Sequence, residues 1–254
     1  MFKDDLLQGK NILITGGGSG LGLAMAHQFA RYGADLWIVG RREEKLREAR
    51  AELEKHGRKV QTFSCDIRDP DRVEEMLATV WDDAPLDVLV NNAAGNFAAP
   101  SESLSHRAVD AVLDSVLHGT AYLTLGCGKR WLEEARSGNV LSIVTTYAST
   151  GSGWVLPSAM GKAGVLAMTR SLAVEWGGRG IRLNAIAPGP FPTPGASKRL
   201  MPDPRLEEMM RKQNPQQRFG DQEELANLAV YLIADGSSYV NGEVVTIDAG
   251  EWLQ

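Results

Sequence analysis

The 254-residue sequence predicts one α/β domain, in which a doubly wound parallel sheet of about seven strands carries helices on both faces. Short apolar runs alternate with helical patterns along the whole chain, and such alternation favours right-handed β-α-β crossovers. No low-complexity linker or internal repeat interrupts the alternation. With 43% hydrophobic residues, a chain of this length can bury one full core. We therefore expect a single domain over residues 1–254.

Strands are expected at the short apolar runs, and helices where apolar residues recur every three to four positions. The predicted strands cover residues 11–15, 35–39, 59–64, 87–91, 139–145, 181–186 and 243–247. Helical spacing is clear at 69–82 and 221–234. The proline-rich segment 188–220 is irregular, apart from a short helix predicted at 203–211. In a compact domain, a long segment of this kind predicts a lid over a site.

The composition argues against several classes of protein. The net charge is −5 and no basic run occurs, so we expect neither a nucleic-acid partner nor an anionic membrane surface. Cys65 and Cys127 are too few for a disulfide framework and too far apart for a metal knuckle, which predicts two reduced thiols and no bound metal. The charged first residues do not resemble a signal peptide. No apolar run approaches the roughly 18 residues of a membrane span, and we expect a cytoplasmic protein.

The first predicted strand leads directly into a glycine-rich loop and then into a helical pattern. Glycines at this point let backbone N–H groups approach a pyrophosphate, which the positive end of the helix also attracts. Glycines that only form a tight turn are the alternative, but the strand–loop–helix context favours a Rossmann-like dinucleotide site. The residues of this loop that we expect to bind the cofactor are Thr15, Gly16, Gly18, Ser19, Gly20, Leu21 and Gly22.

The end of the second strand predicts which dinucleotide binds. An NAD site places a carboxylate about twenty residues past the glycines, whereas this chain has Gly40 there, followed by Arg41 and Arg42. Guanidinium groups match the 2′-phosphate of NADPH in charge and in geometry. The alternative is a solvated helix start, in which Glu43 and Glu44 partly neutralise the arginines. We expect NADPH to be the cofactor.

Further motifs follow the later strands. They are Cys65-Asp66-Ile67, Asn91-Asn92-Ala93-Ala94-Gly95, the segment 140–164 with Lys162, and Pro188-Gly189-Pro190. Together with the glycine loop, these motifs resemble the short-chain dehydrogenase/reductase family, and the resemblance covers nearly the whole chain. It implies further cofactor contacts from Asp66, Asn92, Ala93, Lys162, Pro188, Gly189, Pro190 and Phe191.

One residue of that family's usual active site is missing. Its Tyr-x-x-x-Lys pair needs a tyrosine four residues before Lys162, where Ser158 stands, and a seven-residue spacing falls on Val155. The nearby tyrosine is Tyr147, fifteen residues before the lysine. This arrangement most resembles the NADPH-dependent 2,4-dienoyl-CoA reductases, which use a tyrosine near the end of the fifth strand. The segments that carry this closer resemblance are Asn91–Phe97, Thr145–Ala148, Gly151–Gly153, Pro157–Ala159 and Gly189–Pro190.

The resemblance implies catalytic roles for Tyr147, Lys162, Asn96 and Ser158. If the fifth strand continues far enough, Thr145 and Tyr147 point to the same face, and we then expect Tyr147 to reach the cleft. Tyr147 and Asn96 would donate hydrogen bonds to a thioester oxygen while hydride from NADPH adds to C5. The alternatives are a buried Tyr147 with a satisfied hydroxyl and a Ser158 that only caps its helix.

The same resemblance implies contacts with an acyl-CoA thioester at Arg68, Phe97, Ser105 and Arg199. Arginines suit CoA phosphates and Phe97 suits an acyl chain, although a surface arginine is often only solvated. His118 stands where these families commonly have an asparagine. It is expected to be either a packed, hydrogen-bonded side chain or a proton relay. By resemblance, the chain would act in fatty-acid β-oxidation as a homotetramer.

The sequence leaves three other functions open. A reductase that acts on a single 2,3 double bond of an enoyl thioester would use similar residues. A ketoacyl or alcohol dehydrogenase would need the tyrosine that position 158 lacks. A non-catalytic nucleotide-binding relative would keep the fold without the chemistry, since function depends on the site. Lys162, Asn96 and Tyr147 argue against such a loss.

Overall fold

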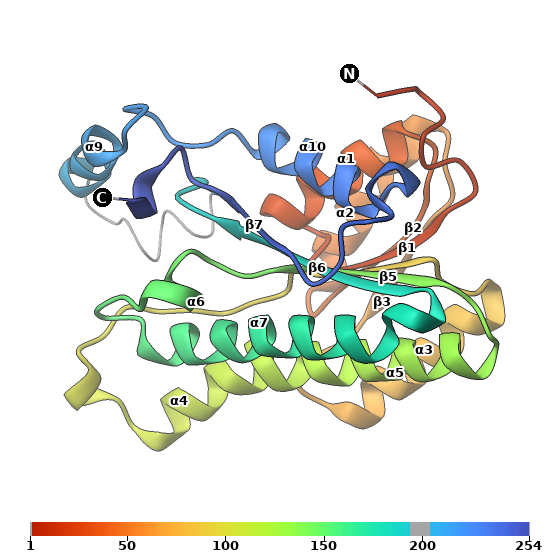
Figure 1. Ribbon diagram of the computed structural model, residues 1–254, viewed down its shortest axis with the longest axis horizontal. Coiled ribbons are helices and arrows are strands. Elements are labelled where there is room, and N and C mark those ends of the chain that lie inside the picture. Colours follow the sequence, from red (N-terminus) through yellow and green to blue (C-terminus); the bar gives the residue numbers. More distant parts are fainter. Residues whose placement is uncertain (1, 194–203, 254) are drawn as a thin grey trace.

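Short apolar runs form the seven strands of one parallel sheet, as the sequence predicts. The structure is a computed structural model that describes residues 2–193 and 204–253 (Figure 1). Each strand begins and ends within two residues of its predicted run. The strands are β1 (Asn11–Thr15), β2 (Asp35–Gly40), β3 (Val60–Ser64), β4 (Val88–Asn91), β5 (Gly138–Ile143), β6 (Ile181–Pro188) and β7 (Val244–Ile247).

The strand order places a crevice at one end of the sheet. The strands lie in the order β3-β2-β1-β4-β5-β6-β7, and each neighbouring pair is parallel. The chain first builds outward from β1 to β3 and then continues from β4 on the other side of β1. Because the order reverses there, the loops after β1 and β4 leave in opposite directions and open a crevice at the carboxyl ends of the strands.

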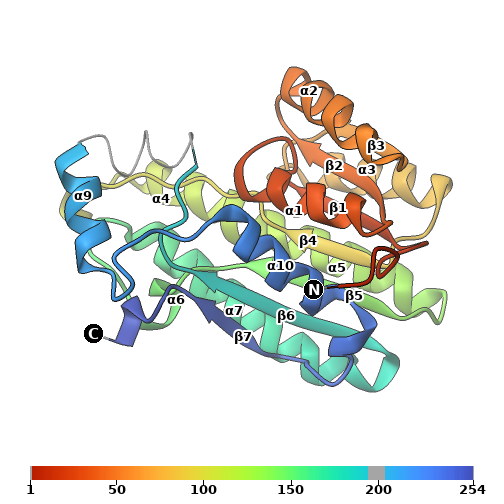
Figure 2. The ribbon, with the colours of Figure 1, turned by 90° about the horizontal axis from the view of Figure 1, so that it is seen from above.

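Helices cover both faces of the sheet (Figures 1 and 2). One face carries α1 (Gly20–Arg31), α2 (Glu43–Leu53) and α10 (Gln222–Ile233), and the other carries α3 (Pro70–Asp83), α5 (Gly119–Glu133) and α7 (Leu156–Trp176). Thus α3 and α10 form where the helical spacing predicts them. Within the described residues, no helix is both long enough and apolar enough to cross a membrane.

The remaining helical elements are short and lie mainly in the connections. They are α4 (His106–Leu113), α6 (Tyr147–Thr150), α9 (Pro204–Gln213), a π-helical turn at Asp114–His118, and 3-10 turns at Glu54–His56, Ser101–Ser103, Gly177–Arg179, Asp235–Ser237 and Glu251–Leu253. The helix predicted at 203–211 corresponds to α9.

Local signals set the starts of two of the covering helices. Asp69 caps α3 by accepting two backbone N–H groups of the first turn, and Pro70 occupies the first helical position. Asp221 and Glu224 form a capping box at the start of α10. Both helices bury one face against the sheet, so their caps also set where the outer layers begin.

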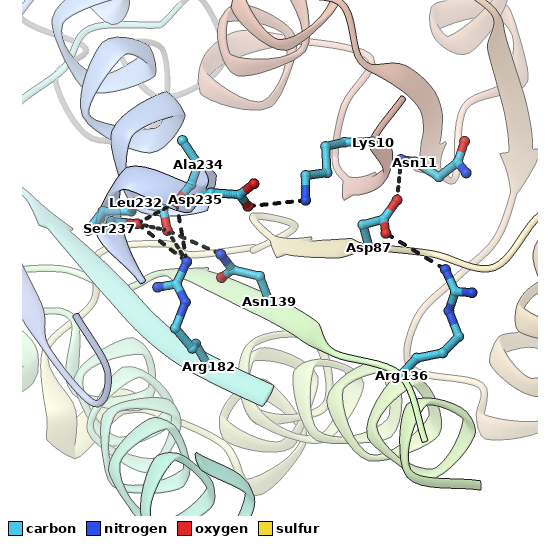
Figure 3. Close-up of polar contacts among 10 residues, drawn as sticks. All are labelled: Lys10, Asn11, Asp87, Arg136, Asn139, Arg182, Leu232, Ala234, Asp235 and Ser237. Atoms are coloured by element: carbon cyan, nitrogen blue, oxygen red, sulfur yellow. Dashed lines mark hydrogen bonds and ion pairs between the residues drawn. The ribbon is translucent and has the colours of Figure 1, made fainter. Parts of the chain in front are cut away.

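A polar network holds the amino ends of the strands to the end of α10 (Figure 3). Arg182 of β6 donates to the carbonyl oxygens of Leu232 at 3.4 Å and Ala234 at 3.5 Å. It also donates to Ser237 Oγ at 3.3 Å and to the carbonyl oxygen of Val240 at 2.8 Å. The carbonyls at the end of a helix have no helical N–H partner, so a cation placed there is favourable. Burial lowers the pKa of Arg182.

The same end of the sheet is fastened by Asp87 and Lys10 (Figure 3). Asp87 accepts from the backbone N–H of Asn11 at 2.8 Å and pairs with Arg136 at 3.8 Å. Lys10 pairs with Asp235 at 3.2 Å. These contacts tie the amino ends together across strands, and the functional loops emerge from the opposite end.

We expect Arg182→Met to lower the free energy of unfolding by about 2 kcal/mol, because it leaves buried carbonyl oxygens without a donor. Equilibrium unfolding in urea measures this loss. Arg179→Met is the matched control, since Arg179 is exposed in the turn Gly177–Arg179. If both variants unfold at the wild-type urea concentration, Arg182 does not hold the end of α10.

Candidate active site

The glycine loop between β1 and α1 has a backbone that other residues cannot form. Gly16 and Gly20 have φ values of +68° and +56°, in the left-handed region. A Cβ atom at Gly22 would overlap the carbonyl oxygen of Gly16, and one at Gly16 would lie 2.9 Å from Nδ2 of Asn92. Ser19 is the N-cap of α1, but its side chain accepts no backbone hydrogen bond. The N–H groups of the first turn are therefore not capped by Ser19, which suits a bound phosphate.

Thr15 and Asn92 lock the loop after β1 to the loop after β4. Thr15 Oγ1 accepts from the backbone N–H groups of Asn92 and Ala93, both at 3.0 Å, and donates to the carbonyl of Val90 at 3.3 Å. Asn92 Nδ2 donates back to the carbonyl of Thr15 at 2.9 Å. Thr15 is buried, so its role is to support the loop from beneath rather than to touch a ligand.

A cleft of about 600 Å³ lies at the carboxyl ends of β1, β2, β3 and β4, and this volume is in the usual range for ligand sites. Eleven of the residues predicted to bind the cofactor line it. They are Gly16, Gly18, Ser19, Gly20, Leu21, Arg41, Arg42, Asp66, Asn92, Ala93 and Phe191.

The other predicted cofactor residues lie around the cleft rather than on its surface. Thr15 and Gly22 support the glycine loop, as described above, and Lys162 is buried. Pro188 ends β6, and Gly189 packs so closely against Asp248 that a Cβ there would lie 2.6 Å from the Cβ of Asp248. Pro190 lines a separate cavity of about 190 Å³, which shares Phe191 with the main cleft.

Three cations gather where β2 ends. Arg41 and Arg42 are exposed and line the cleft, and Lys45 of α2 lines it as well. Within the described residues, neither arginine forms an ion pair with Glu43 or Glu44. The structure thus contains a solvated start of α2, with Arg42 at its N-cap, but without the predicted neutralisation by Glu43 and Glu44. Lys45 was not predicted; it lies in the first turn of α2, three residues after the N-cap Arg42, and also pairs with Glu48 at 2.5 Å.

Arg68 lies in this cofactor cleft, although the sequence resemblance implies a contact with the acyl-CoA. Its guanidinium forms a bidentate pair with Asp66, with Nε at 2.9 Å from Oδ1 and Nη2 at 2.5 Å from Oδ2. The hydrogen bonds from Arg68 lower the pKa of Asp66, and the positive charge of Arg41 adds to the effect. Asp66 is thus held as a carboxylate in the wall of the cleft.

Three of the four predicted catalytic side chains meet at the end of β5. Tyr147 Oη lies 3.3 Å from Asn96 Nδ2 and 3.1 Å from Ser158 Oγ. Asn96 Oδ1 accepts the backbone N–H of Phe97 at 2.8 Å, so the NH₂ group of the amide is the part that faces Tyr147. Tyr147 is half-buried, and its hydroxyl is hydrogen-bonded, as the alternative of a satisfied core tyrosine also expects. Its two partners, Asn96 and Ser158, are themselves predicted catalytic residues.

The route by which Tyr147 reaches this position differs from the prediction. The predicted strand over 139–145 ends at Ile143, and Tyr147 opens the short helix α6. The argument that Thr145 and Tyr147 share a strand face is therefore wrong. Val144 still donates its N–H to the carbonyl of Ile186 in β6 at 2.8 Å; beyond it the chain leaves the sheet, and Thr146 has helical angles of φ −56° and ψ −42°. A helical turn, rather than the alternation of a strand, carries the hydroxyl to Asn96 and Ser158.

Ser158 does not serve as the cap of α7. The N-cap position is Val155, which makes no side-chain hydrogen bond, and Ser158 lies inside the first turn. Its side chain is buried, with 2% exposed, and its hydroxyl meets Tyr147. The alternative that Ser158 is only a capping residue is therefore wrong.

Lys162 lies one helical turn after Ser158 and is buried, with 8% of its surface exposed. Its Nζ donates to the carbonyl oxygen of Ile143 at 2.5 Å. Within the described residues it makes no hydrogen bond to Tyr147. Burial lowers the pKa of Lys162 to about 8, because an ammonium group loses hydration there. One ammonium N–H is used by Ile143, and two remain for a ligand.

The remaining predicted residues lie outside the cleft lining or outside the described chain. Phe97 is half-buried next to Asn96, and Ser105 caps α4 by accepting the N–H of Ala108 at 3.2 Å. Arg199 lies outside the described residues. His118 is half-exposed and pairs with Asp114 at 3.0 Å, so it is hydrogen-bonded as expected but not packed in the interior. Among the described residues, no three His, Cys, Asp or Glu side chains are grouped to hold a metal ion.

The predicted lid over 188–220 is described at 188–193 and 204–220, and residues 194–203 lie outside the described chain. The carbonyl of Pro190 accepts the N–H of Gly220 at 3.1 Å, and the carbonyl of Pro192 accepts Nε2 of Gln222 at 2.9 Å. These bonds fasten the start of the segment to the start of α10. Phe191 and Thr193 of this part line the cleft.

Comparisons with known proteins identify a matching family and several similar proteins. A family described as "Enoyl-(Acyl carrier protein) reductase" matches residues 16–251. A Caenorhabditis elegans protein named "Probable 2,4-dienoyl-CoA reductase 3", with (3E)-enoyl-CoA as its named product, is 41% identical over 99% of this chain and 83% of its own length. A Bacillus subtilis protein named "Probable 2,4-dienoyl-CoA reductase", with (2E)-enoyl-CoA as its named product, is 39% identical over 97% of this chain and 98% of its own length.

A solved structure shows the same fold. The crystal structure of a short chain dehydrogenase from Bacillus anthracis superposes with a TM-score of 0.90. It is 41% identical in sequence, and the superposition covers 98% of this chain and 98% of that one. At this identity and coverage, the similarity extends over the sheet, both helical layers and the loops that build the cleft.

We expect Lys162→Met to stabilise the cofactor-free protein at pH 7 by about 1–2 kcal/mol, because it removes a buried ammonium group. Lysine has a lower pKa in the folded state, about 8, than in the unfolded state, 10.5. The unfavourable burial is therefore fully present below pH 8 and fades as the pH rises from about 8 to 10.5, where only the unfolded chain keeps the proton. Urea unfolding at several pH values measures the difference between variant and wild type.

Lys129→Met provides the control for the Lys162 experiment, because Lys129 is exposed on α5. Its effect on the free energy of unfolding should stay small and should not change between pH 7 and pH 10. A Lys162→Met variant that is less stable than wild type at pH 7 would show that the bond to Ile143 outweighs the burial of charge.

Proposed function

The chain belongs to the short-chain dehydrogenase/reductase family and is an oxidoreductase, and we propose that it reduces 2,4-dienoyl-CoA to 3-enoyl-CoA with NADPH. The observation that carries this proposal is the Tyr147 hydroxyl, which lies between Asn96 and Ser158 at 3.3 and 3.1 Å. Ser158 occupies the usual place of the catalytic tyrosine, so Tyr147 supplies the phenol of this cluster. The names of the two relatives support the same substrate class.

The family binds NAD(P), and the residues of the cleft favour NADPH for this chain. The glycine loop would hold the pyrophosphate, since its shape leaves backbone N–H groups open to an anion. Arg41 and Arg42 would pair with the 2′-phosphate, because Gly40 offers no carboxylate to the ribose hydroxyls. Lys162 would hold the nicotinamide ribose with the N–H groups that Ile143 leaves unused.

The chemistry requires donors for a developing oxyanion. When bound, NADPH supplies the hydride, which adds to C5 of the dienoyl thioester. Negative charge then collects on the thioester oxygen, where Tyr147 and Asn96 donate hydrogen bonds. The hydrogen bond between the Tyr147 and Ser158 hydroxyls can run in either direction. In the proposed reaction, Asn96 Nδ2 and Ser158 Oγ donate to Tyr147 Oη, which leaves the phenol proton for the substrate oxygen. Ser158 thus orients Tyr147 and carries no proton to the substrate.

The position of the final proton decides the product. A proton that reaches C2 of the resulting enolate leaves the double bond between C3 and C4, which gives 3-enoyl-CoA. A proton at C4 would give 2-enoyl-CoA. The names of the two relatives differ on this point, with a (3E) product for the first and a (2E) product for the second. We propose the 3-enoyl product. Hydrogen bonds from Tyr147 and Asn96 keep the negative charge of the enolate at the thioester oxygen, and C2 is nearer to that oxygen than C4.

A ketone reductase is a weaker candidate, because the tyrosine that would protonate an alkoxide is absent at position 158. A second candidate is a reductase of a single 2,3 double bond in an enoyl thioester. The description of the matching family, an enoyl-(acyl carrier protein) reductase, favours it. Both thioester reactions place charge on the same oxygen, and they differ in the carbon that receives the hydride.

The remaining parts of the proposal concern the surroundings of the site. Arg68, Phe97, Ser105 and Arg199 stay proposed acyl-CoA contacts, with segment 188–220 as a cover for the substrate.

We propose a homotetramer that acts in fatty-acid β-oxidation in the cytoplasm. The outer faces of α5 and α7 support self-association, since Leu125 and Val174 are 50% and 86% exposed on neighbouring helices of one layer.

We expect Tyr147→Phe to lower kcat by about 100- to 1,000-fold, because it keeps the ring but removes one oxyanion donor. The affinity for NADPH should change less than about two-fold, since the glycine loop and the cations at the end of β2 are untouched. Ser158→Ala should lower kcat less, and Ser158→Tyr should not create ketone reduction. The oxidation of NADPH by 2,4-dienoyl-CoA, followed at its absorbance maximum, measures all three variants.

The control for Tyr147→Phe is Tyr122→Phe on α5, which lies outside the cleft lining and should keep wild-type kcat. With deuterated NADPH, the label should appear at C5 of a 3-enoyl-CoA. Deuterium at C3 of a 2,3-saturated product would favour the second candidate. Full activity in Tyr147→Phe would refute the role proposed for this tyrosine in either reaction.

We expect Arg41→Ala to weaken NADPH binding by about 10- to 100-fold while NADH binding changes little, because one charge-assisted bond to the 2′-phosphate is lost. Fluorescence titration with each nucleotide measures the two dissociation constants. Arg47→Ala, at an exposed position of α2 outside the cleft lining, should leave both unchanged. Equal losses for NADPH and NADH would remove Arg41 from the phosphate site.

A further inference from the structure

Trp154 has a backbone conformation that a bulky residue rarely adopts. Four non-glycine residues of the described chain have a positive φ, and Trp154, at +70°, is the aromatic one among them. The left-handed region is unfavourable for a side chain with a Cβ, and bulky residues found there mark strain. Strained residues of this kind concentrate at ligand sites, where the surrounding structure holds them in place.

Burial does not offset this strain, because the indole is 62% exposed. Most large aromatic side chains gain stability by covering their surface, and this one leaves most of it in water. A ligand that covered the ring would recover that hydrophobic contribution. The strain and the exposure of Trp154 are therefore unfavourable in the free protein, and a ligand that covers the indole would offset them.

The backbone of Trp154 also belongs to the frame of the chemical site. Its carbonyl oxygen accepts the N–H of Ala99 at 2.8 Å, which joins the turn between α6 and α7 to the segment after β4. Ala99 lies three residues after Asn96, and Trp154 lies four residues before Ser158. This turn is at the same end of the molecule as the C-terminus and α9 (Figure 1). The backbone of Trp154 is thus tied to the segment that carries Asn96, and the residue lies in the turn just before the helix that carries Ser158.

The charge distribution indicates which part of a substrate would reach Trp154. Residues 88–101 and 138–161 contain no Asp, Glu, Lys, Arg or His. The cations of the cleft, Arg41, Arg42 and Lys45, lie instead beyond β1 at the end of β2. The phosphates of the cofactor need cations, whereas a hydrocarbon chain needs an uncharged, apolar surface. The two uncharged segments joined by Trp154 and Ala99 suit the hydrocarbon.

We propose that Trp154 is a specificity-determining residue that covers the acyl chain of the thioester substrate beyond the diene. This inference rests on the function proposed above and adds the part of the substrate that the Tyr147 cluster does not contact. Trp154 sets the preference for longer chains, and it takes no part in the hydride or proton steps.

The test compares Trp154→Gly, Trp154→Phe and wild type on 2,4-hexadienoyl-CoA and 2,4-decadienoyl-CoA. In Trp154→Gly, KM for the ten-carbon substrate should rise about ten-fold or more, while kcat and KM for the six-carbon substrate change less than about two-fold. Trp154→Phe should restore most of the affinity for the longer chain. Equal KM changes for the two chain lengths would overturn the inference.

The stability of the Trp154→Gly variant distinguishes a role in substrate binding from a structural role. Glycine accepts a φ of +70° without strain, so Trp154→Gly should unfold at a urea concentration equal to or above that of wild type. The control is Ala135→Gly, which also relieves a positive φ, of 52°, but lies in the loop before β5, at the amino ends of the strands. It should leave both KM values unchanged. A large loss of stability in Trp154→Gly would mean that the indole supports the fold, and would overturn the inference.

A binding experiment distinguishes failure of this inference from failure of the proposed function. Calorimetric titration with saturated hexanoyl-CoA and decanoyl-CoA reports chain-length preference without turnover. Tighter binding of decanoyl-CoA to wild type, lost in Trp154→Gly, supports the acyl contact even if no dienoyl-CoA is reduced. If wild type reduces dienoyl-CoA and both proteins bind the two chains alike, the proposed function stands and the role of Trp154 is refuted.

Discussion

The hydrogen bonds between Thr15 and Asn92 hold together the two loops on which the rest of the site depends. They join the ends of β1 and β4, where the strand order reverses and a crevice opens. Asn92 Nδ2 also lies so close to the glycine loop that a Cβ at Gly16 would approach it to 2.9 Å. The shape of the phosphate loop and the start of the segment that carries Asn96 are therefore set by one small polar contact. A buried threonine is enough for this purpose because its hydroxyl both donates and accepts.

The site contains several features that do not favour stability. Ser19 stands at an N-cap without capping α1, Lys162 buries an ammonium group, and Trp154 exposes an aromatic ring in a strained conformation. Each feature leaves a group unsatisfied or under strain in the free protein. At the opposite end of the sheet, Arg182 satisfies the carbonyls at the end of α10. These features lie at the end of the sheet where ligands would bind, as is typical of enzymes, although Ala135 at the opposite end also has a positive φ, of 52°.

Charge is distributed unevenly around the crevice, and this distribution orders the ligands within it. Arg41, Arg42 and Lys45 make the region beyond β2 cationic, whereas the segments 88–101 and 138–161 carry no charge. This distribution supports the proposal that a phosphorylated cofactor lies in the first region and an uncharged chain in the second. The cluster of Tyr147, Asn96 and Ser158 lies within these segments, and the buried Lys162 follows one helical turn after Ser158.

The sequence alone determined the strands, the glycine loop, the family and the absence of tyrosine at position 158. These features depend on local periodicity and on residue types at fixed spacings, which no distant contact can change. The tertiary structure decided how the site is assembled. The argument from strand alternation was wrong, because a helical turn after the end of β5 carries Tyr147 to its partners. The contact with Asn96 crosses 51 residues, Arg68 turns to Asp66 in the cofactor cleft, and Ser158 meets Tyr147 instead of capping α7. The bonds of Tyr147 join segments that only folding brings together, whereas Arg68 and Asp66 are two residues apart; in both cases the sequence shows the donors and acceptors but not their partners.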